Sequence, residues 1–174
     1  MVLVLLGTQN NSFHRLLEEI QRLMDKKVIQ EKVVVQAGKT HFISKNMEIF
    51  DLVDQDKLNE LIEQASYIIT HGGVGSILTC VKAGKKVIAV ARKQEYGEHV
   101  NNHQIQIVES FDKAGYLKGI IEVKDLEEAI QELKNFKPEE FVSNTDNMIN
   151  IIEKFIERDS KQKEVKRKKK KGKC

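Results

Sequence analysis

Short apolar runs alternate with segments of helical period along most of this chain, and this alternation constrains its fold more than any other feature. The apolar runs lie at 2–6, 32–38, 47–53, 67–70, 85–91 and 119–123, and the segments of helical period lie at 13–24, 55–65, 75–84, 100–110, 125–136 and 138–159. Strand and helix in repeated succession, with short connections, predict a parallel sheet with helices on both faces. Strands that are apolar almost throughout also fit burial on both sides. We therefore expect an α/β domain built on a parallel sheet.

Several residues mark where these elements begin and end. Asp54 stands where it can cap the helix at 55–65, Gly84 closes the short helix before it, and Pro138 suits the first turn of the last helix. The apolar start at 1–7 lacks a basic leader and is far too short to span a bilayer. It predicts a first strand.

Composition places the chain among single soluble domains. Its 174 residues, 40% of them hydrophobic, suffice for one domain with its own core. The two cysteines, Cys80 and Cys174, do not form a disulfide framework, which favours a reducing compartment. We expect Cys80 to be a small buried residue of a short helix.

The net charge of +3 combines two regions of opposite sign. Residues 160–174 hold nine Lys or Arg and one Glu, a net of +8, which leaves 20 basic and 25 acidic residues, a net of −5, in residues 1–159. We therefore predict a folded domain over 1–159 and a disordered basic tail over 160–174. A basic balance of this origin does not indicate specific nucleic-acid binding by the domain.

Three polar loops follow strands of the predicted sheet. They span Gly7 to Phe13, His71 to Ser76, and Ala91 to Asn102, and they are rich in Gly, Asn, Thr, Ser and His. Ligands of open parallel sheets collect beyond the carboxyl ends of the strands. We therefore expect one binding site where these loops meet.

The first two loops each lead from a strand into a helix. Their helix-start N–H groups, with hydroxyls at Thr8, Ser12 or Ser76, suit an anion. Neither loop is a G-K-[ST] phosphate loop or a G-x-G-x-x-G dinucleotide motif. The other interpretation is that glycine only lets helices pack tightly on the sheet. Two such loops on one edge favour the anion.

Two histidines four residues apart, His99 in the third loop and His103 directly after it, would share a face of a helix. A zinc site would need a third ligand such as His71, but no ligand pattern typical of zinc is present. The block at 101–104, Asn-Asn-His-Gln, suits the hydroxyls of a sugar better than a cation. We therefore predict no metal site and no cofactor.

The segments LVLLGTQNNSFHRLLEEI, VVVQAGKTHF, ASYIITHGGVGSILTCVKAGKKVIAV and EYGEHVNNHQ resemble the split family 28 glycosyltransferases over residues 1 to about 155. Similar chains are the bacterial β-1,4-galactosyltransferases of capsule and exopolysaccharide synthesis and the small subunit of the dolichol-linked UDP-GlcNAc transferase. The resemblance implies a Rossmann-like domain equivalent to the C-terminal, nucleotide-sugar-binding half of a GT-B enzyme.

The resemblance also implies roles for particular residues. The residues similar to diphosphate contacts are Gly7, Thr8, Ser12, Gly72, Gly73, Gly75 and Ser76, with His71 at the entry of their loop. The residues similar to sugar or phosphate contacts are Glu98, His99, Asn102, His103 and Gln104. Thr79 stands where many relatives place a Glu on the ribose, and Ala91 stands where they have proline.

The function implied is the donor-binding, catalytic subunit of an inverting UDP-sugar hexosyltransferase, galactosyl or N-acetylglucosaminyl. It would act on a lipid-linked acceptor with a membrane-anchored partner, at the cytoplasmic face of the membrane. Helix-start amides can stabilise the leaving diphosphate without a metal. The candidate bases are His71, His99 and His103, because histidine titrates near neutral pH, although the base can equally lie on the partner. His14 and His41 are expected to be structural.

Two other functions remain open. A non-catalytic, nucleotide-sugar-binding regulatory subunit would keep the loops without turnover, and Thr79 favours it. A flavodoxin-like or epimerase-like domain is the third interpretation, although a full epimerase would need a second domain. The basic tail would attract an anionic membrane surface reversibly, or would be only a solvated segment.

Overall fold

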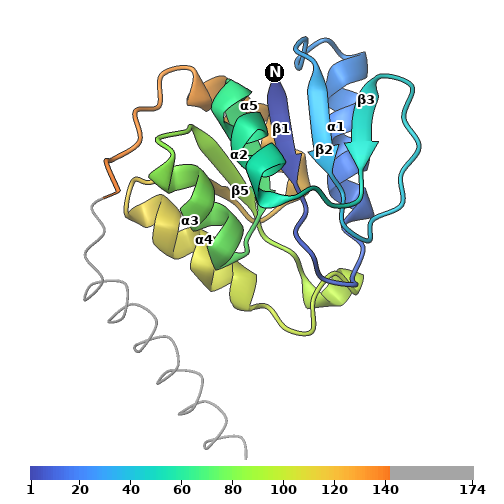
Figure 1. The fold of residues 1–174 in the computed structure, drawn as a ribbon. Helices are drawn as coiled ribbons and strands as arrows, with labels where there is room; N and C mark the ends of the chain where they lie inside the picture. Colours follow the sequence, from blue (N-terminus) through green and yellow to red (C-terminus); the bar gives the residue numbers. More distant parts are fainter. Residues whose placement is uncertain (142–174) are drawn as a thin grey trace, which may run out of the picture. The chain divides into compact units, whose positions relative to one another are not determined.

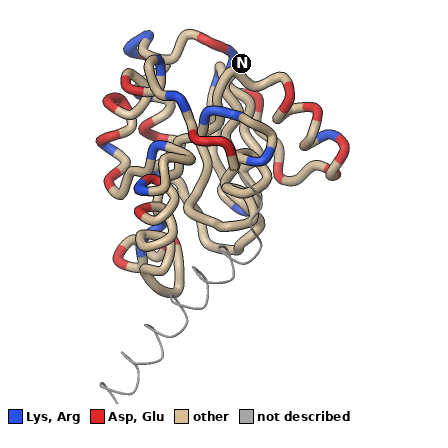
Figure 2. Tube along the Cα trace, turned by 90° about the vertical axis from the view of Figure 1, so that its left-hand side faces the viewer, with Lys and Arg blue, Asp and Glu red and all other residues tan. Residues whose placement is uncertain are grey.

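The computed structural model describes residues 1–141. The predicted boundary at 159, the basic tail at 160–174 and most of the predicted helix at 138–159 lie outside the described residues. Within 1–141 no helix is both long and apolar enough to cross a membrane. Lys and Arg are interspersed with Asp and Glu along this part of the chain (Figure 2).

A six-stranded, fully parallel sheet forms the centre of the domain, in the order β3-β2-β1-β4-β5-β6 (Figure 1). The strands are β1 (Val2–Leu5), β2 (Val33–Gln36), β3 (Met47–Phe50), β4 (Tyr67–His71), β5 (Val87–Val90) and β6 (Lys118–Ile120). In the register, Val2 of β1 lies opposite Val33 of β2 on one side and Tyr67 of β4 on the other. This order is that of the Rossmann fold, so the fold predicted from the sequence is confirmed.

The described domain also contains five α-helices and two 3₁₀ turns. The helices are α1 (His14–Asp25), α2 (Gln55–Gln64), α3 (Val74–Lys82), α4 (His103–Lys113) and α5 (Leu126–Leu133), and the 3₁₀ turns are η1 (Gln94–Tyr96) and η2 (Val123–Asp125). The predicted cap of α2 is present, because Oδ1 of Asp54 accepts a hydrogen bond of 2.8 Å from the Lys57 N–H. Cys80 of α3 is fully buried, as expected, and burial raises the pKa of its thiol to about 12.

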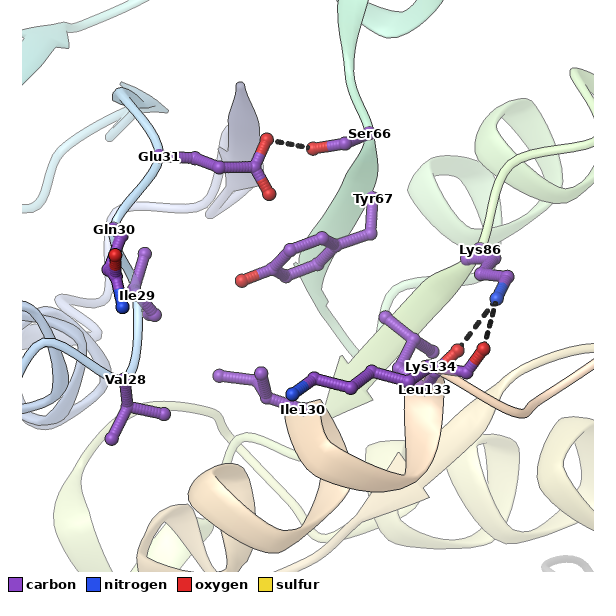
Figure 3. Close-up of a pocket in the computed structure, with 10 residues that line it drawn as sticks. All are labelled: Val28, Ile29, Gln30, Glu31, Ser66, Tyr67, Lys86, Ile130, Leu133 and Lys134. Carbon is purple, nitrogen blue, oxygen red and sulfur yellow. Dashed lines mark hydrogen bonds between the residues drawn. The ribbon is translucent and has the colours of Figure 1, made fainter.

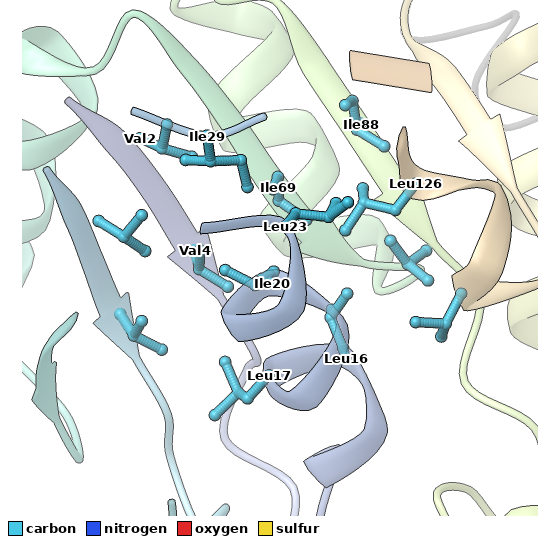
Figure 4. Close-up of a cluster of buried hydrophobic side chains, with 14 of the residues drawn as sticks. Val2, Val4, Leu16, Leu17, Ile20, Leu23, Ile29, Ile69, Ile88 and Leu126 are labelled. Atoms are coloured by element: carbon cyan, nitrogen blue, oxygen red, sulfur yellow. The ribbon is translucent and has the colours of Figure 1, made fainter. Parts of the chain in front are cut away.

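The helices cover both faces of the sheet. α1 and α5 pack on one face, where the apolar stripe of α1 (Leu16, Leu17, Ile20, Leu23) meets alternate residues of β1 and β4 (Figure 4). α2, α3 and α4 lie on the other face (Figure 1). The core therefore has two layers, one on each side of the sheet. The strands β1, β2 and β5 are buried along their whole length.

Several predicted boundaries differ from those of the structure, and three of them are informative. The helix predicted at 100–110 begins only at His103, because Oδ1 of Asn101 accepts a hydrogen bond from the His103 N–H and the preceding residues turn. The strand predicted at 119–123 ends at Ile120, and Val123 begins η2. Pro138 does not begin a helix, since residues 136–141 are irregular and the Glu139 N–H bonds to the carbonyl of Gly115.

Candidate functional site

The three polar loops meet at one edge of the sheet, as predicted. The chain leaves β1 towards the α1 face and leaves β4 towards the α3 face, so these neighbouring strands form the topological switch point of the sheet. The third loop lies beside the first, because the amide Nδ2 of Asn11 donates a hydrogen bond of 2.8 Å to the carbonyl of Gly97. We call this edge the loop rim, made of residues 7–13, 71–76 and 91–102.

His71 lies at the centre of the loop rim as the last residue of β4. Its side chain is buried, and its Nδ1 lies 3.3 Å from the carbonyl oxygen of Leu5. A carbonyl accepts only, so Nδ1 carries the proton and Nε2 is left as an acceptor. Burial and, to a smaller extent, the charge of Arg92 lower the pKa of His71 to about 4. The expectation of a near-neutral pKa is therefore wrong for this histidine, which is uncharged at neutral pH.

Two glycines hold the backbone against the His71 ring. Gly7 has a φ of +75°, which favours glycine, and a Cβ atom placed on it would lie 2.6 Å from Cε1 and Nε2 of His71. A Cβ atom on Gly73 would lie 2.3 Å from the same Nε2. Any larger residue at either position must displace the imidazole. Close packing against the buried His71 ring therefore accounts for glycine at positions 7 and 73.

The other two glycines of the second loop differ from each other. A Cβ atom on Gly72 would lie 2.9 Å from Cβ of Gln104 and from Cγ2 of Val108, so this glycine lets α4 pack closely. Gly75 is exposed and a Cβ atom on it would meet nothing within 4 Å. Packing therefore accounts for Gly72, while nothing in the packing of residues 1–141 requires glycine at 75.

The first turn of α3 presents hydrogen-bond donors to solvent. The helix begins at Val74 after the cap residue Gly73, and its first internal bond runs from the Ile77 N–H to the carbonyl of Gly73. The N–H groups of 74–76 precede that bond and have no partner within the helix. Thr79 is exposed one turn later, and its hydroxyl donates to the carbonyl of Gly75 at 2.9 Å. Amide donors and the positive end of the helix dipole thus face outward beside His71.

Glu98 is buried in the third loop and engaged by neighbouring residues. Its two carboxylate oxygens accept from Nε and Nη2 of Arg15 at 2.5 and 3.0 Å, and Oε2 also accepts from the Lys93 N–H at 3.0 Å. Arg15 comes from the start of α1, so this ion pair ties the third loop to α1. The role of Glu98 in sugar contact stays a prediction, and its role in fixing the loop is visible.

The remaining residues of the Asn-Asn-His-Gln block and their neighbour His99 take separate positions. His99 lies before α4, so it does not share a helical face with His103, and its Nε2 lies 3.3 Å from Nε2 of Gln9. Asn102 accepts from the Gln94 N–H at 2.9 Å, and buried Gln104 accepts from the Arg92 N–H at 3.1 Å. Among residues 1–141 no three His, Cys, Asp or Glu side chains are grouped as metal ligands.

The hydroxyl residues of the first loop, Thr8 and Ser12, are both exposed, and Ser76 is half-buried on α3. His14 and His41 belong to α1 and to the connector after β2, as predicted, and Nδ1 of His14 lies 3.2 Å from the His41 carbonyl. The His14 ring thus contacts the connector that carries His41.

Sequence reasoning missed Arg92, the most deeply buried charge of the loop rim. Its side chain is almost inaccessible, and its guanidinium donates to backbone carbonyls of both the first and the third loop. One signal in the sequence is a pair of basic residues, Arg92 and Lys93, directly after an apolar strand. Such a pair is equally typical of a solvated loop.

A pocket of about 320 Å³ lies at the opposite edge of the sheet, near the amino ends of β4 and β5 (Figure 3). Ile29, Tyr67 and Ile130 supply apolar walls. Nζ of Lys86 donates to the carbonyls of Leu133 and Lys134, and the Ser66 hydroxyl donates to Glu31. The predicted site residues do not line this pocket.

Comparison with known proteins agrees with this geometry. Residues 1–170 match the glycosyltransferase family 28 C-terminal domain. The chain is 28% identical over 109 residues to the UDP-N-acetylglucosamine transferase subunit ALG13 of Candida albicans, covering 63% of this chain and 36% of that protein. It is 33% identical over 63 residues to the mouse subunit of the same name, covering 36% of this chain and 5% of that protein. The chain thus spans about a third or less of these relatives.

Solved glycosyltransferases share the fold. The glycotransferase of kitacinnamycin matches with a TM-score of 0.54 and 19% identity, over 76% of this chain and 34% of that one. The calicheamicin glycosyltransferase CalG4 matches with a TM-score of 0.53 and 19% identity, over 75% and 34%. With a Rossmann-type strand order, a polar site at its switch point and a family match across nearly its whole length, the chain belongs to glycosyltransferase family 28 and corresponds to its C-terminal domain.

Proposed function

We propose that this chain is the donor-binding, catalytic subunit of an inverting UDP-sugar glycosyltransferase that works with a membrane-anchored partner on a lipid-linked acceptor. The observation that carries the proposal is the loop rim itself. The outward N–H groups at the start of α3 and the neutral His71 lie together at the switch point between β1 and β4. A diphosphate needs such donors, and the relatives named as UDP-N-acetylglucosamine transferase subunits support the choice of nucleotide.

The leaving group is stabilised at the loop rim by hydrogen bonds and the dipole of α3. Negative charge builds on the diphosphate as its bond to the sugar breaks, and fixed amide donors need no reorganisation to meet it. His71 contributes as a neutral side chain whose Nε2 accepts a hydrogen bond. A histidine with a pKa near 4 is a weak base, so His99 and His103 are better candidates to deprotonate the acceptor hydroxyl on this chain.

Calorimetry with UDP tests donor binding. We expect the full chain to bind UDP in EDTA, with no gain in affinity on adding Mg²⁺, because the donors at the loop rim are backbone and neutral groups. Binding that disappears with the chelator would contradict the metal-free site. Replacing UDP by UMP is the matched control, since UMP keeps the uridine but lacks the second phosphate and should bind more weakly.

A partner chain is expected to supply the acceptor site. One Rossmann-like half offers only one wall of a GT-B cleft. The exposed apolar side chains Tyr96 and Val100 lie in the third loop of the rim. The isolated chain should therefore bind UDP but transfer sugar poorly. Efficient transfer to a lipid-linked acceptor by the purified chain alone would contradict this.

The proposed location is the cytoplasmic face of a membrane. The net charge of +8 at 160–174 lies outside the described residues, and its contribution would be reversible and sensitive to salt. Co-sedimentation with vesicles of neutral or anionic lipid compares the full chain with a version that ends at Asp159. Only the full chain should sediment with anionic vesicles at low salt, and equal sedimentation would remove the tail from the account.

A regulatory, non-catalytic subunit is the second candidate, and Thr79 favours it. Residue 79 is a threonine and offers no carboxylate to a ribose at this exposed position. Its hydroxyl donates a hydrogen bond to the α3 backbone. Replacing Thr79→Glu distinguishes the two. An increase in UDP affinity without any transfer activity in the presence of a partner would support the regulatory function.

A further inference from the structure

Arg92 is a buried cation with an unusual set of partners. Its side chain is 1% exposed, and its guanidinium lies 5.3 Å from the centre of the Phe13 ring. Within residues 1–141 its Nε is buried without a hydrogen-bond partner. Burial lowers the pKa of the guanidinium, and Glu98 partly offsets this. A group that is costly to bury and incompletely satisfied is unlike a residue chosen for packing alone.

The guanidinium joins two loops through their carbonyl oxygens. Nη2 donates to the carbonyl of Leu6 at 2.6 Å, and Nη1 donates to the carbonyls of Asn11 and Glu98 at 3.0 and 3.4 Å. Leu6 directly precedes the first loop, Asn11 lies within it, and Glu98 lies in the third loop. One planar fork thus fixes the distance between them, which a lysine cannot reproduce.

These bonds also set the direction of two amide donors. In a trans peptide the carbonyl of one residue and the N–H of the next point in opposite directions. Because the carbonyls of Leu6 and Asn11 point at Arg92, the N–H groups of Gly7 and Ser12 point away from it. Neither N–H has a hydrogen-bond partner within residues 1–141. The buried cation thus turns two free donors of the first loop away from its own guanidinium.

We propose that Arg92 is a positioning residue that orients the Gly7 and Ser12 amides for an anionic ligand and holds the first loop against the third. The inference rests on the proposed function for the identity of the ligand, a nucleoside diphosphate. Its geometric part does not depend on that identity. Arg92 itself is too deeply buried to contact the ligand, so it acts through the backbone of the first loop.

The test compares Arg92→Lys with Leu126→Ala, a substitution at a fully buried core position at the start of α5. Both destabilise the domain, but only the first removes the fork. In the ligand-free chain, NMR order parameters of the Gly7 and Ser12 amides should fall from about 0.85 to below about 0.6 in Arg92→Lys. They should not change in Leu126→Ala. Calorimetry should show at least a tenfold rise in the Kd for UDP in Arg92→Lys alone.

Each outcome decides the inference. Unchanged order parameters in Arg92→Lys, or an equal fall in Leu126→Ala, would overturn it. If the parent chain fails to bind UDP, the proposed function fails, and the order parameters still decide the role of Arg92. If Arg92→Lys does not fold, the unsubstituted chain supplies the measurement. Its Arg92 Nη signals should show hindered rotation, and freely rotating Nη groups would contradict a fixed fork.

Discussion

The two edges of the sheet use their polar groups in opposite ways. At the amino edge, the Lys86 ammonium bonds to two carbonyls of α5 and its end, and the Glu31 carboxylate accepts from Ser66. At the carboxyl edge, the buried charge of Arg92 and the neutral ring of His71 are bonded inward, while the N–H groups at the start of α3 point outward.

This difference separates stability from binding. At the amino edge, Lys86, Ser66 and Glu31 bond to groups of the same edge. At the loop rim, Arg92 bonds to backbone carbonyls from within, and the N–H groups at the start of α3 are left for a ligand. A pocket alone therefore does not mark the site, since these polar groups of the amino-edge pocket are already bonded.

Leu126→Ala should lower the free energy of unfolding by about 3 kcal/mol, because it empties a fully buried core position away from the loop rim. UDP affinity should stay within about twofold. Denaturant unfolding and calorimetry measure the two quantities. Glu128→Ala, exposed on the same helix, is the control and should cost less than about 0.5 kcal/mol. A large loss of affinity in Leu126→Ala would break the separation of stability from binding.

Because of His71, the free energy of unfolding should fall as the pH is lowered. Its pKa in the folded chain is about 4, below the ordinary value of 6.5, so the unfolded state binds the proton first. The stability associated with the neutral ring is full above pH 6.5 and is lost as the pH falls from 6.5 towards 4. Between pH 7.5 and 5 this should amount to about 2 kcal/mol.

His71→Asn isolates that contribution, because an amide N–H can still donate towards Leu5 but does not titrate. The free energy of unfolding of the parent chain and of His71→Asn is measured at pH 7.5 and at pH 5. Subtracting one pH dependence from the other cancels the contribution of the carboxylates, which both chains share. The same pH dependence in both chains would show that His71 is not responsible.

Gly73→Ala should weaken UDP binding about tenfold, or about 1.4 kcal/mol, by pushing the His71 ring from its place. The backbone at Gly73 is accessible to alanine, with a φ of −82°, so the domain should remain folded. Lys82→Ala at the other end of α3 is the matched control. An unchanged Kd in Gly73→Ala would mean that the position of His71 does not matter for the nucleotide.

Lys86→Met should have the smallest effect and only at the amino edge. Removing its bonds to the carbonyls of Leu133 and Lys134 should cost roughly 1 kcal/mol of stability. UDP affinity should not change. Thermal unfolding together with calorimetry measures both, and weaker UDP binding in this variant would place part of the ligand site at the wrong edge.

Much of the fold could be predicted from the sequence because its causes are local. Apolar runs and helical periods reveal buried strands and amphipathic helices, and Asp54 caps its helix through bonds within four residues. The shared edge of the three loops follows from the parallel sheet. The start of α4 could not be predicted, because the Asn101 side chain decides it and asparagine is equally suited to a turn.

The burial of Arg92 and the low pKa of His71 depend on contacts between residues far apart in the sequence. They could not be predicted from the sequence for that reason. Arg92 is buried only because Leu6 and Asn11, more than 80 residues earlier, turn their carbonyls towards it. His71 was identified, but its low pKa depends on burial between Gly7 and Gly73. The sequence pattern predicts that Gly7 and Gly73 lie against a phosphate. The structure shows that glycine is needed at both positions because the His71 ring lies against them. The roles of the residues towards a sugar nucleotide stay predictions.

An NMR titration of the amide signals with UDP, in EDTA, locates the nucleotide site on the chain. The shifts should be concentrated in residues 7–13, 71–76 and 91–104, with the largest at the start of α3. Signals around the pocket at the amino edge, at 28–31 and 66–67, should not move. Absence of any shift at millimolar UDP, or shifts centred on the amino edge, would contradict the assignment of the loop rim as the nucleotide site.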